Sequence, residues 1–573
     1  MAPGSRLFTR RTPVSAHSTV GPDAAAPAAA RRVGAQRLGA WAPLVALWLL
    51  VGALLGPSIA GDDFWWTDEA RHAMGGVFIL DVVRDMPLAD PMGYAMRYFA
   101  QYPALALNWY LPGFYAFEAM AFAVFGVSAP VARGLVFAFC LVGVSVWFTW
   151  ARRGWGGAAA FLATAAWLSP PVWNLWSRSV MLEAPVVTML IVSLCAFQRY
   201  LDKPTWMRSI LVGSSLAVAL MIKQTAGFML PALVLYALAT PSRGALWRRE
   251  ASAGFLLTTV ALALVTLHAL KFGSQGLASV AGDIPEAASG ATARWSLERW
   301  LFFPRTLWHT WGPYLMVLSA AGAVLPRRGG ERRLPMIYAW VVCWYLAASL
   351  LLVGPNASRY TMYVFPALGL LAARPIYVFR GRAGVQGIAV LIVAVGVTAS
   401  LWRTSREPTP RVDGYRAVAE SIYATGTRAP MLYAGKHDGN FIFHLRRLDS
   451  ARQHVVLRAD KILVSLAVHK YFGMQSHVRS LEEIRDMMAR YGVQYVVLES
   501  PDILKLKEFG MLARLVQEPE FEKVKVFPVV ASGGALGPER VEIYRYRDFQ
   551  PGNASEIVIP LPHMGREIRF RPH

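Results

Sequence analysis

Charged side chains are scarce in this sequence. Asp, Glu, Lys and Arg make up 16% of the 573 residues and 55% are hydrophobic, which excludes an ordinary soluble protein and predicts an integral membrane protein. Acidic residues are fewer than basic ones, 36 against 58, which gives a formal net charge of +22. Because the basic residues cluster in short connections between apolar runs, we interpret the charge as membrane topology and expect no nucleic-acid partner.

Cysteines and metal-binding patterns are also few. The three cysteines, Cys140, Cys195 and Cys343, all lie inside apolar runs, so no disulfide framework is predicted. The acids after the first apolar run lack metal-ligand spacing, and the histidines of "HDGNFIFH" form no recognisable zinc motif. The spacing gives no support for a divalent metal, and we expect no obligatory metal cofactor.

Long apolar runs dominate the rest of the chain. Residues 1–40 are rich in Ala, Pro and Arg, and we expect a disordered basic cytoplasmic tail followed by an uncleaved first helix at residues 40–59. Ten or so further runs bring the total to about eleven spans. These runs cover residues 131–150, 158–173, 184–200, 209–222, 227–239, 251–270, 311–325, 335–353, 360–373 and 385–401.

The basic connections set the predicted topology. Counting from the basic tail places all of them on the cytoplasmic side, provided that residues 209–239 split at "KQT" into a hairpin of two short helices. We therefore predict a membrane module at residues 41–402 whose first periplasmic loop, residues 61–130, carries interfacial helices. Residues 403–573 are then predicted to lie in the periplasm.

From residue 403 the hydropathy falls and the pattern becomes that of a small α/β domain. Strands are predicted at "APMLYAG", "QYVVLES" and "VEIYRYR". Asp413 is expected to cap a helix that carries Tyr415. Ser480 and Glu483 have the spacing of a capping box, and Gly492 is expected to end the helix that they begin.

The first outer loop is too long for a connector and too apolar to be disordered. "TDEARHAMGGVFILDVVRD" predicts one interfacial helix, and "LPGFYAFEAMAFAVFGV" predicts a second. On the first helix Asp68 lies three residues before Arg71 and four before His72, so these side chains share a face from which Glu69 points away. The alternative is that Asp68 and Glu69 only cap the helix and favour its dipole.

Further charged residues are predicted on the same side of the membrane. Glu183 lies at the outer end of the fourth span, where it either serves a site or stabilises the helix end with Arg178 as its partner. Lys223 and Arg359 either extend to the interface or bind an anionic headgroup. With Asp68, these residues describe a cavity with carboxylates for a general base and cations for a lipid phosphate.

The order of these features resembles the GT-C superfamily of polyprenyl-phosphate-dependent glycosyltransferases. It is most similar to the protein mannosyltransferase and aminoarabinose transferase branch, glycosyltransferase families 39 and 83. The resemblance covers roughly residues 41–402 and rests on "TDEARHA", "LPGFYAFEAMAFAVFGVSAPVAR", "SRSVMLEAPVVTMLIVSLCAFQRYL" and "SRYTMYVFPALGLLAA" in that order. It implies an α-helical polytopic GT-C fold and inverting transfer of a sugar from a polyprenyl phosphate at the bacterial inner membrane, to a periplasmic protein, lipid or polysaccharide acceptor.

The resemblance also implies roles for particular residues. The implied catalytic carboxylates are Asp68, Glu69 and Glu183. The implied contacts to the donor phosphate are Arg71, Lys223 and Arg359. The residues assigned to position the acceptor or the loop are His72, Tyr110 and Glu118. The stretch "NWYLPGFY" departs from the family, since many relatives have Lys-Pro-Pro or His-Pro-Pro there, which leaves Lys223 or Arg71 to compensate.

Two other functions stay open at this point. Intramembrane charges would also suit a transporter or flippase of a lipid-linked substrate, but the sequence shows no inverted repeat and no matching pair of broken helices. The other alternative is an inactive GT-C-like scaffold whose C-terminal domain binds a partner, against which the combination of Asp68 and Glu183 argues. The donor sugar, the polyprenol length, the acceptor and the oligomeric state leave no signature in the sequence.

Overall fold

The computed structural model describes residues 26–106, 109–272, 295–352, 357–466, 474–550, 556–561 and 566–570. The chain divides into two units, Met1–Ala46 and Leu47–His573, and every residue of the candidate site belongs to the second. Helix α1, Ala26–Leu55, begins within the predicted tail, of which residues 1–25 lie outside the described residues.

A helix stands at each of the predicted spans. Seven helical segments in the described part of the chain are long and apolar enough to cross a membrane. They comprise α1 with η1 (Gly56–Ser58), α5 (Ala129–Trp155), α8 (Glu183–Asp202), α11 (Ala251–Phe272), α16 (Leu334–Leu351), η4 (Ala357–Val364) with α17 (Phe365–Val378), and α18 (Ala383–Arg406). Shorter apolar helices occupy the other predicted spans, namely α6 (Gly157–Leu168), α9 (Trp206–Ile222), α10 (Met229–Leu238) and α15 (Pro313–Val324). The prediction of a multi-pass helical membrane protein is confirmed.

The predicted break at "KQT" is present. Helix α9 ends at Ile222, Lys223 has extended backbone, and the short helix η2 (Gln224–Phe228) leads into α10. Lys223 contacts Glu183 at the start of α8, whereas Tyr200, near the end of α8, donates a hydrogen bond to the carbonyl of Ala245 after α10. The chain therefore turns back at Lys223 and forms the expected hairpin.

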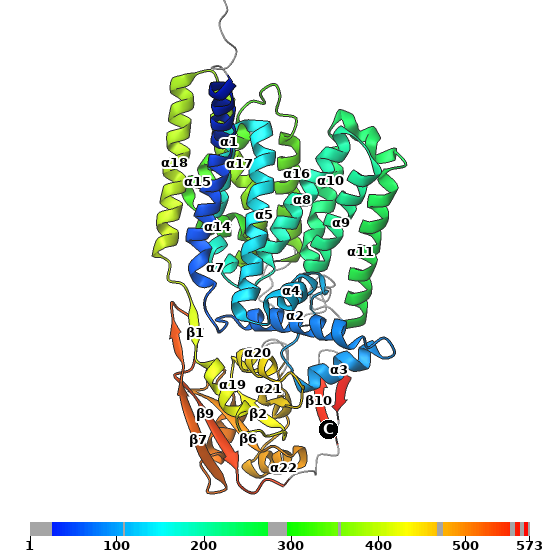
Figure 1. Cartoon of the computed structure of the whole chain (residues 1–573), viewed down its shortest axis with the longest axis vertical. Coiled ribbons are helices and arrows are strands. Elements are labelled where there is room, and N and C mark those ends of the chain that lie inside the picture. Colours follow the sequence, from blue (N-terminus) through cyan, green and yellow to red (C-terminus); the bar gives the residue numbers. More distant parts are fainter. Residues whose placement is uncertain are drawn as a thin grey trace, which may run out of the picture. The chain divides into compact units, whose positions relative to one another are not determined.

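The first outer loop folds into three helices beside the transmembrane helices. Helix α2 (Thr67–Asp85) coincides with the predicted helix, and α4 (Gly113–Phe125) begins directly after Pro112. Helix α3 (Pro91–Gln101), capped by Asp90, was not anticipated from the sequence. Figure 1 shows α2 and α4 between the apolar helices and the C-terminal strands. Other helices in the described residues between α1 and the C-terminal strands are α7 (Pro171–Ser177), η3 (Pro241–Trp247) and α14 (Leu297–Thr310).

The C-terminal region has the predicted mixture of strands and helices. Its main sheet has the order β3-β2-β6-β9-β7, in which β2 is parallel to β3 and β6, and β9 is antiparallel to β6 and β7. These strands are β2 (Met431–Ala434), β3 (Val456–Arg458), β6 (Tyr495–Ser500), β7 (Phe521–Pro528) and β9 (Arg540–Tyr546). The helices are α19 (Tyr415–Tyr423), α20 (Asp438–Leu448), α21 (Ala459–Ile462), α22 (Leu481–Tyr491) and α23 (Lys507–Leu515). Two-stranded sheets pair β1 (Arg411–Asp413) with β8 (Val530–Ser532), β4 (Val464–Leu466) with β5 (Met474–Ser476), and β10 (Ile557–Leu561) with β11 (Arg566–Phe570).

The predicted helix caps of this region are only partly correct. The Ser480 hydroxyl accepts a hydrogen bond from the N–H of Glu483 at 3.2 Å, and Gly492 ends α22 with a positive φ of 62°. The Glu483 carboxylate accepts from the N–H of Arg479 instead of that of Ser480, so the capping box is half formed.

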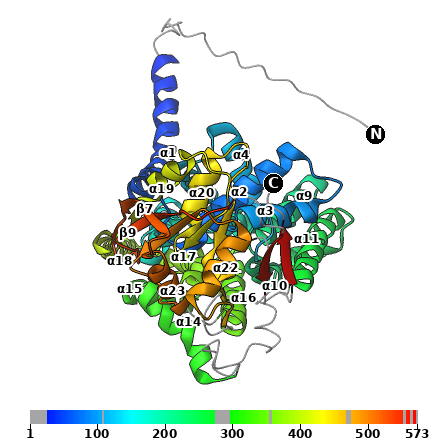
Figure 2. The same ribbon diagram turned by 90° about the horizontal axis from the view of Figure 1, so that it is seen from below.

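The expected cap by Asp413 is wrong. Asp413 is the last residue of strand β1, and Gly414, at a φ of 136°, turns the chain before α19 begins. The cap comes instead from Asp63 of the first outer loop, whose Oδ2 accepts hydrogen bonds from the N–H groups of Gly414 at 2.7 Å and Tyr415 at 2.9 Å. The first loop and the C-terminal region are thus joined, and α20 lies beside α2 in both views (Figures 1 and 2).

Candidate active site

Glu69 fastens the start of α2 to the segment before α8. Its carboxylate is fully buried; Oε1 accepts a hydrogen bond from the N–H of Trp66 at 3.2 Å and Oε2 one from the N–H of Val180 at 2.9 Å. The Arg133 guanidinium lies 3.9 Å from Oε2. Burial raises the pKa of Glu69, and Arg133 with the backbone N–H groups opposes that rise. Both oxygens of Glu69 are therefore engaged within the protein.

Asp68, its neighbour, is the accessible carboxylate of the pair. Its side chain is 37% exposed, and its Oδ2 accepts a hydrogen bond from the indole N–H of Trp66 at 3.3 Å. The same oxygen lies 3.7 Å from Nη1 of Arg359, which belongs to η4. Residues far apart in the sequence thus meet at Asp68.

Glu183 is the buried centre of the charged cluster. Its Oε1 accepts a hydrogen bond from Nζ of Lys223 at 2.6 Å and lies 3.3 Å from Nε of Arg359. Asp68, Arg359, Glu183 and Lys223 consequently form one chain of alternating charges. Charges taken out of water need such partners, because an unpaired one would be costly. The charged cluster hereafter means these four residues.

Aromatic rings cover the cations of the charged cluster. The Tyr360 ring lies 5.0 Å from the Lys223 ammonium and 5.4 Å from the Arg359 guanidinium. The Trp176 ring lies 5.8 Å from Arg359, and the Tyr110 ring 5.9 Å from Lys223. Ring faces attract cations and exclude water, which strengthens electrostatic interactions in the cluster.

His72 is buried next to the charged cluster. Its Nδ1 is 3.1 Å from the hydroxyl of Tyr115, and its ring lies 5.1 Å from the ring of Tyr110. Burial, as the main cause, lowers the pKa of His72 to about 4, so the imidazole is neutral near pH 7. Within the described residues its Nε2 has no hydrogen-bond partner. His72 therefore offers one free polar atom beside the cluster.

Glu118 and Arg71 lie away from the charged cluster. Glu118 on α4 packs against Gly76 of α2, where an added Cβ would come within 2.4 Å of the Glu118 Cβ. Burial raises the pKa of Glu118 well above its usual value. Arg71 instead donates to the carbonyl of Thr67 at 2.8 Å and pairs with Asp438 of α20 at 3.4 Å.

One expected partner of Glu183 is found elsewhere. Arg178 donates to the carbonyl of Leu54 at 2.8 Å and to the hydroxyl of Thr409 at 2.7 Å, so its predicted pairing with Glu183 is wrong. Arg178 follows the end of α7 and lies near the end of α1. Glu183 instead pairs with two other cations, Lys223 and Arg359.

Helix α20 supplies contacts that the sequence did not suggest. Nε2 of His444 lies 2.6 Å from Oδ1 of Asp63, and the side chain of Asn440 bonds both the N–H and the carbonyl of Phe64. Further along α2, Asp81 pairs with Arg446 at 2.5 Å. These contacts hold α2 from the side facing the C-terminal region. No local pattern in a single sequence could have signalled them, because the partners lie hundreds of positions apart.

No group of three or more His, Cys, Asp or Glu residues in the described part of the chain is placed to hold a metal ion. Catalysis without an obligatory metal therefore remains a prediction.

Comparisons with known proteins bear on the fold. A family model described as dolichyl-phosphate-mannose-protein mannosyltransferase matches residues 111–270. No curated protein sequence matches the chain. Among solved structures, ArnT from Cupriavidus metallidurans bound to undecaprenyl phosphate is similar, with a TM-score of 0.55 and 16% identity over 90% of this chain and 99% of that one. The chain has the GT-C fold.

Other GT-C structures agree with this assignment. Arabinofuranosyltransferase AftD from Mycobacteria has a TM-score of 0.51 and 15% identity, with 91% of this chain and 41% of that chain covered. The Archaeoglobus fulgidus oligosaccharyltransferase in complex with Zn and sulfate has a TM-score of 0.50 and 11% identity, with 80% and 68% covered. The resemblance to GT-C glycosyltransferases that the sequence motifs indicate is confirmed.

Proposed function

We propose that this chain is a membrane glycosyltransferase that moves a sugar from a polyprenyl phosphate to an acceptor hydroxyl, with inversion at the anomeric carbon. The observation that carries the proposal is the charged cluster, in which Arg359 contacts both the accessible Asp68 and the buried Glu183. The GT-C fold and the undecaprenyl phosphate bound by ArnT support the lipid-phosphate donor.

In the proposed reaction, Asp68 is the general base. Its carboxylate accepts the proton of the acceptor hydroxyl while that oxygen forms a bond to the anomeric carbon. The bond from the anomeric carbon to the phosphate oxygen breaks, and polyprenyl phosphate departs with the electron pair. Asp68 suits this role because it is the more exposed acid of the adjacent pair, whereas Glu69 is engaged with backbone N–H groups.

Arg359 and Lys223 are proposed to stabilise the departing phosphate. Glu183 holds both cations at fixed positions before the substrate arrives, so little reorganisation is needed when negative charge develops. The unpartnered Nε2 of His72, with Tyr110 beside it, is proposed to orient the acceptor. Arg71, which faces α20, remains a proposed phosphate contact, and Glu118 a proposed support for the loop through its packing against Gly76.

The location of the reaction is part of the proposal. The protein is a multi-pass membrane protein with the charged cluster at the ends of the helices that meet the first loop. The distribution of basic connections supports a bacterial inner membrane with a cytoplasmic N-terminus and a periplasmic site. We propose the domain limits 41–402 for the catalytic module and 403–573 for the periplasmic region.

Replacement of Asp68 tests the function directly. Asp68→Asn keeps the shape and removes the base, and general-base removal typically costs about 10²- to 10⁴-fold in rate. We expect transfer from a polyprenyl-phosphate sugar by the purified protein to fall in that range, while membrane insertion and lipid phosphate binding persist. Full activity in this variant would contradict the mechanism, and transbilayer movement of the lipid without sugar transfer would support a flippase.

Mass spectrometry of the cell envelope identifies the substrates. Cells with and without the gene are compared for polyprenyl-phosphate sugars and for envelope glycans. An accumulating donor identifies the sugar, and a missing product identifies the acceptor as protein, lipid or polysaccharide. Unchanged glycans and lipid-linked sugars under expression of the wild-type gene would argue for an inactive scaffold.

A further inference from the structure

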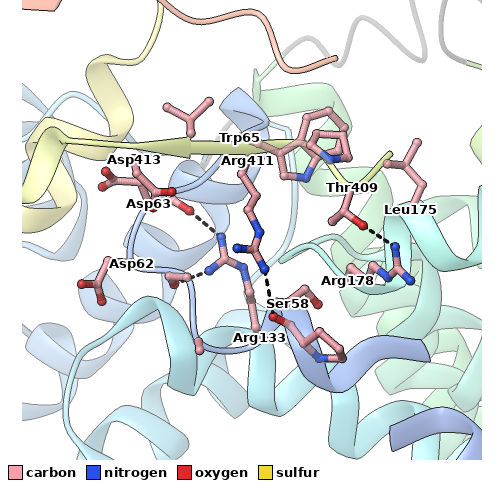
Figure 3. A pocket seen from close by; sticks show the side chains of 15 residues that line it. Ser58, Asp62, Asp63, Trp65, Arg133, Leu175, Arg178, Thr409, Arg411 and Asp413 are labelled. Atoms are coloured by element: carbon pink, nitrogen blue, oxygen red, sulfur yellow. Dashed lines mark hydrogen bonds between the residues drawn. The ribbon is translucent and has the colours of Figure 1, made fainter. Parts of the chain in front are cut away.

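A polar pocket of about 280 Å³ lies where α1 ends (Figure 3). It is lined by η1 and the loop after it, by Arg133 of α5, by Arg178 after α7, and by residues 409–413, which connect α18 to the C-terminal region. Asp68, Glu183, Lys223 and Arg359 are not among its lining residues. The pocket is therefore distinct from the charged cluster.

Three arginines enter this pocket from three different elements. Figure 3 shows Arg133, Arg178 and Arg411 around one space. Arg178 and Arg411 donate only to neutral oxygens, Arg178 to Leu54 and Thr409, and Arg411 to the carbonyl of Pro57 at 3.3 Å. In the described ranges neither has a carboxylate within salt-bridge distance. Neither guanidinium thus forms an ion pair there, although Asp413 of the same pocket attracts Arg411 from a greater distance.

Two of the three acids that line the pocket have partners outside it. Both oxygens of Asp63 are used, Oδ1 by His444 and Oδ2 by the N-terminus of α19. Asp62 pairs with Arg416 at 3.1 Å. Burial raises the pKa of Asp413 and the neighbouring Asp63 adds to that rise, while Arg411 and Arg133 oppose it. Arg178 and Arg411 therefore face the space without a carboxylate in salt-bridge contact among the described residues.

The pocket also lies at a defined depth. On the last turns of α1, Leu49 is 69% exposed, as expected for a helix surface that faces lipid. The pocket begins at Pro57 and Ser58, directly after this helix ends at Leu55. The end of an apolar span is the level at which phospholipid headgroups lie, and guanidinium groups bind phosphate with paired, charge-assisted hydrogen bonds.

We propose that this pocket binds a phosphate group, carried by a lipid headgroup or free in solution, through Arg178 and Arg411 with Arg133 behind them. A phosphate bound there would bridge the end of α1 and the segment that leads from α18 to the C-terminal region. The site is independent of sugar transfer, so its test needs no donor or acceptor.

The test measures phosphate binding by the purified full-length protein. In one arm, native mass spectrometry compares retained phosphatidylglycerol with phosphatidylcholine, whose headgroup carries a compensating positive charge; in the other, inorganic phosphate is titrated in detergent. The variants are Arg411→Gln, an exposed residue with a single carbonyl partner, and Arg178→Gln. Arg406→Gln is the control, since Arg406 is an exposed arginine on the last turn of α18 that does not line the pocket.

We expect wild-type protein to retain phosphatidylglycerol preferentially and each pocket variant to bind it about tenfold more weakly, as loss of a charge-assisted hydrogen bond implies. Arg406→Gln should stay within about twofold of wild type. If the variants weaken binding of inorganic phosphate but not of phosphatidylglycerol, the site is still supported, and its ligand is free phosphate in solution. No preference in either arm, or equal losses in Arg406→Gln, would overturn the proposal. If Arg178→Gln fails to fold, the binding measured for Arg411→Gln alone tests the proposal.

Discussion

Arg359 stands between two carboxylates, with Nη1 3.7 Å from Oδ2 of Asp68 and Nε 3.3 Å from Oε1 of Glu183. Each edge of one planar guanidinium therefore serves a different acid. In the proposed reaction, a donor phosphate would compete with the longer contact to Asp68, while the shorter contact to Glu183 would keep the guanidinium in place.

Arg359→Lys should preserve the charge and lose the two-sided geometry. A lysine ammonium is a point donor and cannot span Asp68 and Glu183 as the planar group does. We expect the kcat for sugar transfer to fall by about 10²-fold, in the range seen when one electrostatic contact to a transition state is removed. Steady-state rates of purified protein measure this effect, with the exposed Arg332→Lys as the matched control. A wild-type kcat in Arg359→Lys would contradict this role of the Arg359 guanidinium.

Glu183→Gln should destabilise the protein because Lys223 and Arg359 lose their shared anion. Breaking a buried ion pair from one side costs about 3 to 5 kcal/mol. The double variant Glu183→Gln/Lys223→Met should recover part of that loss, since it no longer buries an unpaired ammonium. Thermal unfolding midpoints in detergent, read as a double-mutant cycle, test the coupling. Additive losses would show that the two residues act independently.

His72 should make stability depend on pH. Its pKa is about 4 in the folded protein, below the ordinary 6.5, so between these values the unfolded chain binds a proton that the folded chain does not. Stability is then fully present above pH 6.5 and falls as the pH decreases towards 4, by up to about 3 kcal/mol. Denaturation midpoints at pH 7 and pH 5 should differ less in His72→Gln than in wild type. Tyr115→Phe, which keeps the imidazole, should retain the dependence, and an unchanged slope in His72→Gln would refute the assignment.

Arg446→Gln should loosen the contact between α2 and α20. Asp81 is 3% exposed and pairs with this arginine at 2.5 Å, so the substitution leaves a buried carboxylate whose remaining cation is the exposed Arg84 at 4.0 Å. We expect a loss of about 3 kcal/mol or more. Arg416→Gln, at an exposed ion pair with Asp62, should cost under about 1 kcal/mol. Thermal midpoints compare the two variants, and equal effects would count against the buried pair.

The sequence predicted those parts of the fold whose signal is local. Hydropathy located the apolar helices, Pro112 marked the start of α4, and the polar "KQT" marked the break at Lys223. The charged cluster could also be anticipated, because Asp68, Glu183, Lys223 and Arg359 all lie at the starts or breaks of predicted helices on one predicted side. Such residues need partners, and the supply of partners on that side was small.

The remaining contacts could not be predicted because their partners are far apart in the chain. Arg71 shares a helix face with Asp68, which suggested a common site, yet its carboxylate partner is Asp438 of α20. Arg178 is five positions from Glu183 but donates to Leu54 and Thr409. Helical spacing shows which side chains share a face, but it does not show which other segment packs against that face.

The cap of α19 has a consequence for biogenesis. Its acceptor, Asp63, precedes the capped Gly414 by 351 positions, with most of the transmembrane helices between them. A ribosome makes Asp63 long before it makes α19, so the first outer loop must already be on the correct side of the membrane when the last third of the chain emerges. If the two segments were inserted on opposite sides of the membrane, Asp63 could not reach Gly414 and Tyr415, and α19 would form without this cap.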